Sequence, residues 1–590
     1  MCVILKPVCA PMSEDFSKAT IEQLLQRALK HHNAFKIKEA IYFYEKILSI
    51  SPGNPHAIHY LGVAYYQLNE HDLALKFLEM AVSLKPESSE TFNHYGSALL
   101  KVENFEAAEA AFRQALKLYP SNAEALFNLG NLIISGPELQ NQVDTIAPER
   151  AVEATHLLRQ AIALNPDHLT WQLELANALI ELDEKLEAQQ IIDDVISKEP
   201  TLAKAYFIRA IIKRGDLDLI KCVLLSPASH RAINNLGRVK LMQEDLNAVV
   251  PLHKKASIIA PNDPSVRWGL ANALLATGDL KKGWREARWR HKKPELLIER
   301  QGLPKEWHGE EIKNGKLLIY HEQGIGDELR FASCFKDLIN KSSAPCIIET
   351  DHRLVSLFSR SFPKLEFINK LPRSKDAIPA VNYSHLVKTH NIEAHTALGD
   401  LPLHLRPNIE SFSKEKSYLK PNPNFSNAWK KLLNKKGPGI KIGFCWNTAL
   451  PNKIYDDYFF SIKELGPIFS IENSVLINLQ ATDCEEELKI AEQHFGIEIY
   501  RPESIDMFNE LDNLTALISQ LDFVVGPNTS IISIGGAVGT RTFGLTLSKS
   551  WTCLGTDDFP WNPTMTLFYK EMSSSWKPII DKVANIIVNS

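Results

Sequence analysis

The chain is poor in cysteine, lacks long apolar runs and carries almost no excess of charge of one sign. Its eight cysteines are scattered over 590 residues without a Cys-x-x-Cys pair, so we expect reduced, buried thiols and no cysteine metal site. No segment approaches the roughly 20 apolar residues of a membrane-spanning helix. The N-terminus is apolar but has no basic segment before it, which argues against a secretory signal. We therefore expect a cytoplasmic protein without a membrane span.

Charge and composition narrow the class of protein further. Sixty-six Lys and Arg residues against 70 Asp and Glu leave a net charge of −4, so the overall charge does not indicate nucleic acid as a partner. A hydrophobic content of 45% excludes a mostly disordered chain, and 590 residues are too many for one compact domain. The sequence predicts a globular protein of several domains.

A period of 34 residues runs through the first half of the chain. Three residue types keep this interval in phase: Pro52, Pro86, Pro120, Pro166 and Pro200; Gly62, Gly96 and Gly130; and Ala40, Ala74, Ala108, Ala154 and Ala188. Two helices of about a dozen residues with their turns make one such unit, which buries its apolar face by stacking on its neighbours. Small residues allow the helices to approach closely, and each proline stops the second helix. The pattern resembles the tetratricopeptide repeat, with Tyr65, Ala74, Ala81 and Pro86 at consensus positions.

The repeats predict an α-helical superhelix over residues 21–293, after an N-terminal tail over 1–20. The phase slips by twelve residues, which predicts an inserted loop around 135–148, and a degenerate unit follows near 203–228. Such superhelices expose a long concave surface, so we expect a groove that holds a protein or peptide partner. A spacer or a dimerisation arm is the alternative interpretation.

The second half changes its period, and short apolar runs alternate with helical stretches. This alternation predicts parallel α/β sheets: a linker over 294–311 and two Rossmann-like halves over 312–425 and 438–590. Ligands are expected at the carboxyl ends of the strands, in the cleft between the halves. The expected strands are 316–321, 346–350, 440–445, 475–479, 497–500, 523–525 and 542–545, and the expected helices are 327–340, 484–495, 512–521 and 529–538.

A glycine-containing turn, 322–327, follows the first expected strand and opens a helix. Gly324 and Gly326 permit a tight turn and close approach of the backbone to a ligand, and the helix N-terminus supplies N–H donors to an anion. Asp327 in that turn is a candidate general base for an acceptor hydroxyl. The alternative is that Asp327 is only the N-cap of the helix.

A second motif begins after the expected strand 523–525. Asn528, Thr529 and Ser530 stand where a glycine-rich helix starts, which predicts a cradle for a diphosphate, with N-capping by Asn528 or Thr529 as the alternative. Further polar residues that follow strand ends predict the rim of the same cleft: Trp446 and Asn447, Lys453 in the following loop, and Gln480. The spacing of the repeat-region histidines implies no metal-ligand geometry: His31, His32, His56, His59 and His71.

Taken together, these segments resemble the heptosyltransferase-type glycosyltransferases (glycosyltransferase family nine), in the bacterial form that follows tetratricopeptide repeats. The segments that carry the resemblance are 278–279, 283–284, 289–290, 322–327, 444–447, 479–480, 521–525, 528–529, 535–539 and 561–565. The layout is also similar to that of the O-linked N-acetylglucosamine transferases. The resemblance implies a GT-B fold and sugar transfer from a nucleotide sugar, without a metal or another cofactor. It implies Asp327 as the base, and it implies donor binding by the C-terminal half.

Three positions depart from the family's pattern. Asn528 stands where the pattern has aspartate, Ser533 where it has histidine, and Phe460 where it has arginine before Ser-Ile. Transfer to a lipopolysaccharide-type sugar acceptor fits the resemblance but leaves the repeats without a role, so two main functions stay open. One is a glycosyltransferase that acts on a protein or peptide held by the repeats. The other is an interaction scaffold whose transferase-like domain has lost catalysis.

Overall fold

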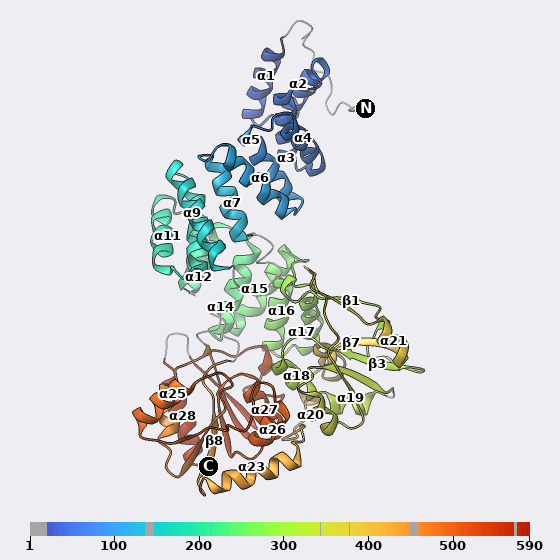
Figure 1. The fold of residues 1–590 in the computed structure, drawn as a ribbon, viewed down its shortest axis with the longest axis vertical. Helices are drawn as coiled ribbons and strands as arrows, with labels where there is room; N and C mark the ends of the chain where they lie inside the picture. Colours follow the sequence, from blue (N-terminus) through green and yellow to red (C-terminus); the bar gives the residue numbers. More distant parts are fainter. Residues whose placement is uncertain are drawn as a thin grey trace. The chain divides into compact units, whose positions relative to one another are not determined.

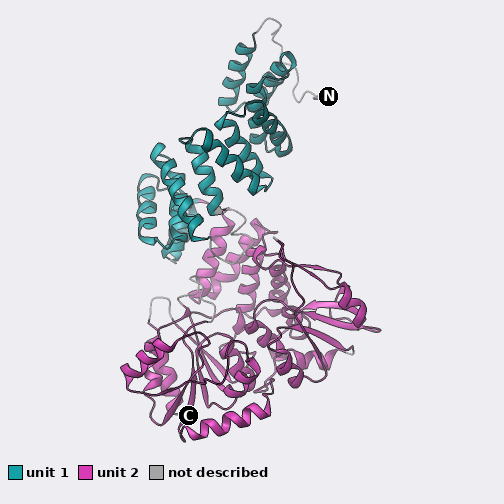
Figure 2. Cartoon of the chain, viewed as in Figure 1, with its two compact units in different colours: residues 1–225 teal, residues 226–590 magenta. Residues whose placement is uncertain are grey.

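The computed structural model describes residues 20–135, 147–213, 215–342, 344–376, 378–448, 458–570 and 575–590. It divides into two compact units, residues 1–225 and 226–590 (Figure 2). The second unit holds the last repeat helices together with all the sheets. The boundary between the two compact units therefore lies before the end of the repeats. The domain boundaries expected from the sequence remain predictions.

The first unit consists of helices in successive pairs (Figure 1). The helices are α1 (Ile21–Asn33), α2 (Ile37–Ile50), α3 (Pro55–Gln67), α4 (His71–Leu84), α5 (Ser89–Lys101), α6 (Phe105–Leu118), α7 (Ala123–Ser135), α9 (Pro148–Leu164), α10 (Leu169–Glu181), α11 (Lys185–Lys198), α12 (Ala203–Lys213) and α13 (Asp216–Leu225). Each periodic proline lies just after a second helix, as Pro52 does after α2 and Pro86 after α4. Most of the predicted inserted loop, 136–146, lies outside the described residues.

Glycines allow the two helices of a repeat to approach closely. A Cβ atom on Gly62 would lie 2.7 Å from Leu78 Cγ, and one on Gly96 would lie 2.7 Å from a ring carbon of Phe112. Both distances are shorter than van der Waals contact, so these positions exclude larger residues. The structure confirms this reason for the periodic glycines.

The second unit begins with two more helix pairs, α14 (His230–Met242) with α15 (Leu246–Ile259), and α16 (Pro264–Ala276) with α17 (Leu280–Ala287). The last pair shares one apolar core with the sheets that follow it. Trp284 of α17 is 3% exposed, and its ring contacts those of Trp551 and Trp561 edge-on at centroid distances of 5.9 and 6.1 Å. These last helices are therefore an integral part of the α/β core.

The unit contains two larger parallel sheets. The first has the order β2-β7-β3-β4-β5, and the second has the order β10-β9-β8-β11-β12-β13. All their pairings are parallel, which confirms an α/β architecture. The first sheet comprises β2 (Lys305–Glu306), β3 (Lys316–Tyr320), β4 (Cys346–Thr350), β5 (Glu366–Asn369) and β7 (Ile392–Ala397). The second comprises β8 (Ile440–Phe444), β9 (Ser474–Asn478), β10 (Ile499–Tyr500), β11 (Phe523–Pro527), β12 (Arg541–Thr546) and β13 (Met565–Tyr569).

The second sheet has the doubly wound strand order 3-2-1-4-5-6 when its strands are numbered along the chain. The order reverses between β8 and β11, and ligands of such sheets bind at this reversal, beyond the carboxyl ends of the strands. A small separate pair, β1 (Glu299–Gln301) and β6 (Ala380–Asn382), completes the strands of the described residues.

Helices join the strands of both sheets. They include α18 (Ile325–Ala332), α19 (Phe335–Lys341), α20 (Val355–Ser361), α21 (Ser384–His390), α22 (Leu401–Leu405), α23 (Pro423–Lys435), α24 (Gly466–Phe469), α25 (Glu485–Phe495), α26 (Leu511–Ile518), α27 (Ser530–Val538) and α28 (Lys577–Val588). The helix predicted over 327–340 was wrong as one element, because the chain breaks between α18 and α19 at Ser333 and Cys334. None of the helices among the described residues has the length and apolarity that crossing a bilayer requires.

A buried ion cluster joins the end of the repeats to the first sheet. Arg290, in the short 3-10 helix η1 (Arg288–Lys292) after α17, donates from Nε and Nη2 to the Glu322 carboxylate at 2.9 and 2.6 Å. Its Nη2 also donates to Asp400 Oδ1 at 2.7 Å. Burial raises the pKa of Asp400, but the guanidinium outweighs it and holds that pKa well below its usual range. One buried guanidinium thus faces two buried carboxylates, and Arg288 adds a second positive charge, with its Nε 3.4 Å from Asp400 Oδ2.

The shared core predicts the effect of truncating Trp284. We expect Trp284→Ala to lower the free energy of unfolding of the second unit by about 3–5 kcal/mol, because it removes a buried ring and leaves a cavity. Trp289→Ala is the matched control, since that ring is half-buried beneath Arg267 and Lys292 and its loss should cost about 1 kcal/mol. Chemical denaturation of the full chain measures both, and equal losses would contradict the shared core.

Candidate functional site

A cavity of about 580 Å³ lies in the second unit where the carboxyl ends of the two large sheets meet. Segments at the ends of strands from both sheets line it: 323–326 after β3, 351 and 353 after β4, 370 after β5, 447–448 after β8, 480–481 after β9, 528–531 after β11, and 546 at the end of β12 with 548 and 550 after it. Because parallel strands end at the same edge of a sheet, the topology collects these loops in one place. The cavity therefore lies at the position that α/β sheets use for ligands.

Two helix N-termini, one from each half, open at this cavity. α18 starts at Ile325 and α27 at Ser530, and both first residues line the wall. No side chain of the described residues caps either helix, so their first N–H groups are available to a ligand. The two helices also pack against each other. Such a pair of positive dipole ends favours an anion such as a phosphate.

The glycines of the 322–327 turn keep the backbone accessible. Gly324 and Gly326 both line the cavity, and a Cβ atom on either would meet nothing within 4 Å. Gln323 adopts a left-handed conformation with φ of 62°, which turns the chain sharply before α18. At these two glycines no side chain separates the backbone from the cavity.

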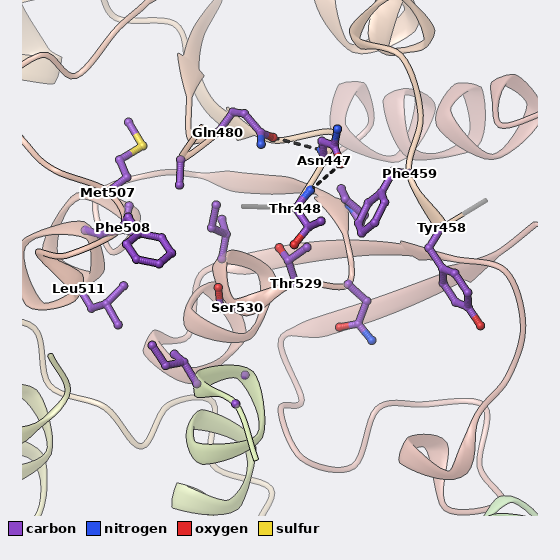
Figure 3. Close-up of a pocket in the computed structure, with 18 of the residues that line it drawn as sticks. Asn447, Thr448, Tyr458, Phe459, Gln480, Met507, Phe508, Leu511, Thr529 and Ser530 are labelled. Carbon is purple, nitrogen blue, oxygen red and sulfur yellow. Dashed lines mark hydrogen bonds between the residues drawn. The ribbon is translucent and has the colours of Figure 1, made fainter. Parts of the chain in front are cut away.

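Gln480 holds the loop after β8 in place. Its Oε1 accepts hydrogen bonds from the backbone N–H groups of Trp446 and Asn447 at 3.2 and 3.0 Å, and its Nε2 donates to Thr482 Oγ1 at 2.9 Å. Asn447 Oδ1 in turn accepts from the N–H of Thr448 at 2.8 Å (Figure 3). The Gln480 amide is thus engaged in shaping the wall that it lines.

Trp446 lies beneath the wall rather than on it. Its side chain is 1% exposed, belongs to the core below the second sheet, and donates from Nε1 to Glu487 Oε1 at 3.2 Å. Asn447, its neighbour, reaches the cavity. The structure thus separates two adjacent residues that the sequence analysis grouped as ligand-binding.

Asn528, Thr529 and Ser530 all line the cavity at the start of α27. Thr529 occupies the N-cap position but its side chain makes no capping bond, so the capping alternative is wrong for this residue. Ser533, one turn further, donates from Oγ to the Thr529 carbonyl at 3.2 Å and is buried. Phe460 is also buried, with its ring 5.3 Å from that of Trp576.

Asp327 is the third residue of α18, and Gly324 is the N-cap, so Asp327 does not cap this helix. Its Oδ1 accepts a hydrogen bond from Arg330 Nη1 at 2.6 Å, and Arg330 lies over the Trp551 ring at 5.4 Å. Gly326 lines the cavity, whereas Asp327 is not among the lining residues. The carboxylate is thus adjacent to the cavity and engaged with a neighbouring guanidinium. Lys453, the other charged candidate, lies outside the described residues.

The sequence analysis missed three charged residues of the wall. Asp351 accepts from Arg353 Nε at 2.8 Å and from Lys370 Nζ at 2.7 Å. Burial alone would raise the pKa of Asp351. The two cations have the larger, opposite effect and hold that pKa well below its usual range. Two cations and one carboxylate leave one net positive charge on the described wall. Asp351 follows an expected strand and could have been found, whereas Lys370 follows β5, a strand that was not predicted.

An apolar surface completes the cavity. Met507, Phe508 and Leu511 lie together on one side, and Tyr458 and Phe459 lie on the other (Figure 3). Arg353 spans the two halves here, since its Nη1 donates to the Phe508 carbonyl at 3.0 Å and its guanidinium lies 4.9 Å from that ring. Apolar walls with a small number of polar groups are typical of sites for small organic ligands.

Comparisons with known proteins support the repeat region. A profile described as anaphase-promoting complex, cyclosome, subunit 3 matches residues 33–115, and two tetratricopeptide repeat profiles match 96–146 and 146–207. The first unit is therefore a tetratricopeptide repeat region of the kind that binds proteins.

One similar protein extends beyond the repeats. Protein FlbA of Caulobacter vibrioides (strain ATCC 19089 / CIP 103742 / CB 15) is 29% identical over 442 residues, which cover 74% of this chain and 70% of that protein. A match of 442 residues exceeds the length of either unit, so it includes parts of both.

Among solved structures, a tetratricopeptide repeat protein from Parabacteroides merdae ATCC 43184 is similar to 42% of this chain and 97% of its own, with 18% identity and a TM-score of 0.35. PilF of Pseudomonas aeruginosa is similar to 42% of this chain and 95% of its own, with 18% identity and a TM-score of 0.28.

The role of Gln480 in the wall is testable. We expect Gln480→Ala to lower the free energy of unfolding by about 1–3 kcal/mol, because two N–H groups lose their acceptor in a buried place. Gln520→Ala is the control, since that half-buried amide donates to the hydroxyl of the adjacent Ser519 and holds no backbone N–H among the described residues, so its loss should stay within about 0.5 kcal/mol. Thermal unfolding followed by calorimetry measures the difference, and a neutral Gln480→Ala would contradict the assigned role.

Proposed function

We propose that the second unit is a metal-independent glycosyltransferase of the GT-B fold. It transfers a sugar from a nucleotide-sugar donor to a protein or peptide presented by the repeats. The observation that carries the proposal is the pair of uncapped helix N-termini, α18 and α27, at one cavity between two parallel sheets. A diphosphate is the anion whose charge and length suit two such dipole ends.

The cavity supplies most of what sugar transfer requires. The leaving nucleoside diphosphate gains negative charge, which the N–H groups at Ser530 and in the 324–326 turn stabilise together with the net positive charge of the wall. Asp327 is the proposed base for the acceptor hydroxyl, a role for which it must release Arg330 and turn toward the cavity. Tyr458 and Phe459 on one side, or Phe508 on the other, offer a face for the nucleobase.

The acceptor class follows from the first unit. A tetratricopeptide repeat region presents an extended surface suited to a protein or peptide, and it precedes the second unit in the same chain. A transferase for a small acceptor would leave that surface without a role. We therefore propose a polypeptide acceptor.

Gly326 provides a test of the donor site. Gly326→Asp places a carboxylate in open space at the second position of α18. There its charge interacts favourably with the helix dipole but repels a bound phosphate. We expect at least a tenfold loss of affinity for the nucleotide that stabilises the wild type, with no loss of melting temperature in the free protein. A thermal-shift panel of nucleoside diphosphates and nucleotide sugars measures both.

Gly326→Ala is the matched control, because it adds a methyl group without charge and should lose far less affinity. Wild-type affinity in Gly326→Asp would mean that the nucleotide binds elsewhere.

Asp327 provides a separate test of catalysis. We expect Asp327→Asn to leave nucleotide binding within about twofold of the wild type and to reduce sugar transfer by about 10²–10⁴-fold, the usual contribution of a general base. Quantifying the nucleotide released from the donor, with and without acceptor, gives the rates. Unchanged turnover would remove Asp327 from the base role.

A second candidate function is a scaffold that binds a nucleotide sugar without transferring the sugar. The engagement of Asp327 with Arg330, outside the lining of the cavity, favours it. The two functions separate in the same experiments: nucleotide binding that Gly326→Asp weakens, with no turnover in the wild type toward any acceptor, would identify the scaffold.

A further inference from the structure

Two histidines and a glutamate from successive repeats converge in the first unit. His59 lies on α3, and Glu90 and His94 lie one turn apart on α5. The Nε2 of His59 is 3.2 Å from His94 Nδ1 and 3.9 Å from Glu90 Oε1, and the three ligand atoms all lie within 4.8 Å of one another. Residues four apart on a helix share a face, so α5 presents Glu90 and His94 together to His59.

A hydrogen-bond chain fixes the orientation of the His59 ring. Thr91 Oγ1 donates to Ser88 Oγ at 2.8 Å, so its lone pair accepts from His59 Nδ1 at 2.8 Å. This assigns the His59 proton to Nδ1 and leaves the lone pair of Nε2 directed at His94. Metal-binding histidines are held in this way, with the second ring nitrogen donating to an oxygen.

We propose that His59, Glu90 and His94 form a binding site for a divalent transition metal, of which Zn²⁺ fits best. Zn²⁺ binds histidine nitrogens at about 2.0–2.1 Å, which places two such nitrogens roughly 3.3 Å apart in a tetrahedral site. The 3.2 Å separation of the His59 and His94 nitrogens matches this value. Two imidazoles and one carboxylate are an established zinc ligand set, with water as the fourth ligand.

The burial of the three residues suits such a site. His59 is 6% exposed and held by Thr91, whereas the Glu90 side chain is 61% exposed. The carboxylate can therefore rotate onto the ion from the solvent side, where a fourth ligand also has room. The ion would crosslink α3 and α5, and so add to the His59–Thr91 hydrogen bond that already links these two repeats. This inference is independent of sugar transfer.

A plain hydrogen bond between the two imidazoles is the competing explanation of the same geometry. It requires neither Glu90 nor the Thr91 hydroxyl, so these two residues distinguish the explanations. Glu90 is exposed, and a change there is not expected to disturb folding.

The test is a titration with ZnCl₂ of the full chain, from which a chelator has first removed any metal. A chromophoric chelator is present and competes for Zn²⁺, so that weak surface sites on the protein take up no ion. We expect one tight site in the wild type. Glu90→Gln and His94→Gln should each weaken it at least tenfold, and Thr91→Val should weaken it by about 10–100-fold while keeping one ion per chain. His56→Gln is the matched control, because His56 lies on α3 three residues before His59 and its side chain is exposed. This variant should bind Zn²⁺ as tightly as the wild type does.

Two further readouts decide the outcome. Zn²⁺ should raise the melting temperature of the wild type but not that of His94→Gln, and Co²⁺ should give the visible absorption of a tetrahedral site in the wild type alone. The proposal is overturned if the wild type takes up no tight ion, or if Glu90→Gln and His94→Gln bind as tightly as His56→Gln does.

Discussion

The second unit depends on one apolar core that contains the last repeat helices as well as the sheets. Trp284 of α17 packs against Trp551 and Trp561, and its cluster continues through the strands of both halves. The same arrangement brings Arg290 into a place without solvent, where the carboxylates of Glu322 and Asp400 compensate its charge. Glu322 begins the turn that leads into α18, so the end of the repeats is bonded to the start of the cavity wall.

Local patterns in the sequence predicted most of the elements and much of the wall. A period of 34 residues fixes helix ends through proline and helix contact through glycine, and both are local effects. The strands β3, β4, β8 and β11 are short apolar runs in the sequence, because both faces of a parallel sheet are covered. Since parallel strands place their ends together, the sequence alone assigns the residues after them to one cleft.

Effects that depend on distant contacts could not be predicted in the same way. Trp446 and Asn447 are adjacent and polar at their tips, yet one packs below the sheet and the other reaches the cavity, because the loop conformation is set by Gln480. The orientation of Asp327 depends on Arg330 and the ring of Trp551. The convergence of His59 with His94 depends on how two repeats stack, and their separation of 35 residues resembles any other repeat contact.

Arg353 has a mechanical consequence for the second unit. Its guanidinium comes from the loop after β4, pairs with Asp351, and reaches across to the Phe508 carbonyl and ring of the other half. Separating the two halves would cost Arg353 a carbonyl acceptor and a ring contact but not its ion pair, because Asp351 lies on its own side. The nearby Arg360 differs from Arg353, because its guanidinium pairs with Asp512 of the other half, so the same separation would break an ion pair there.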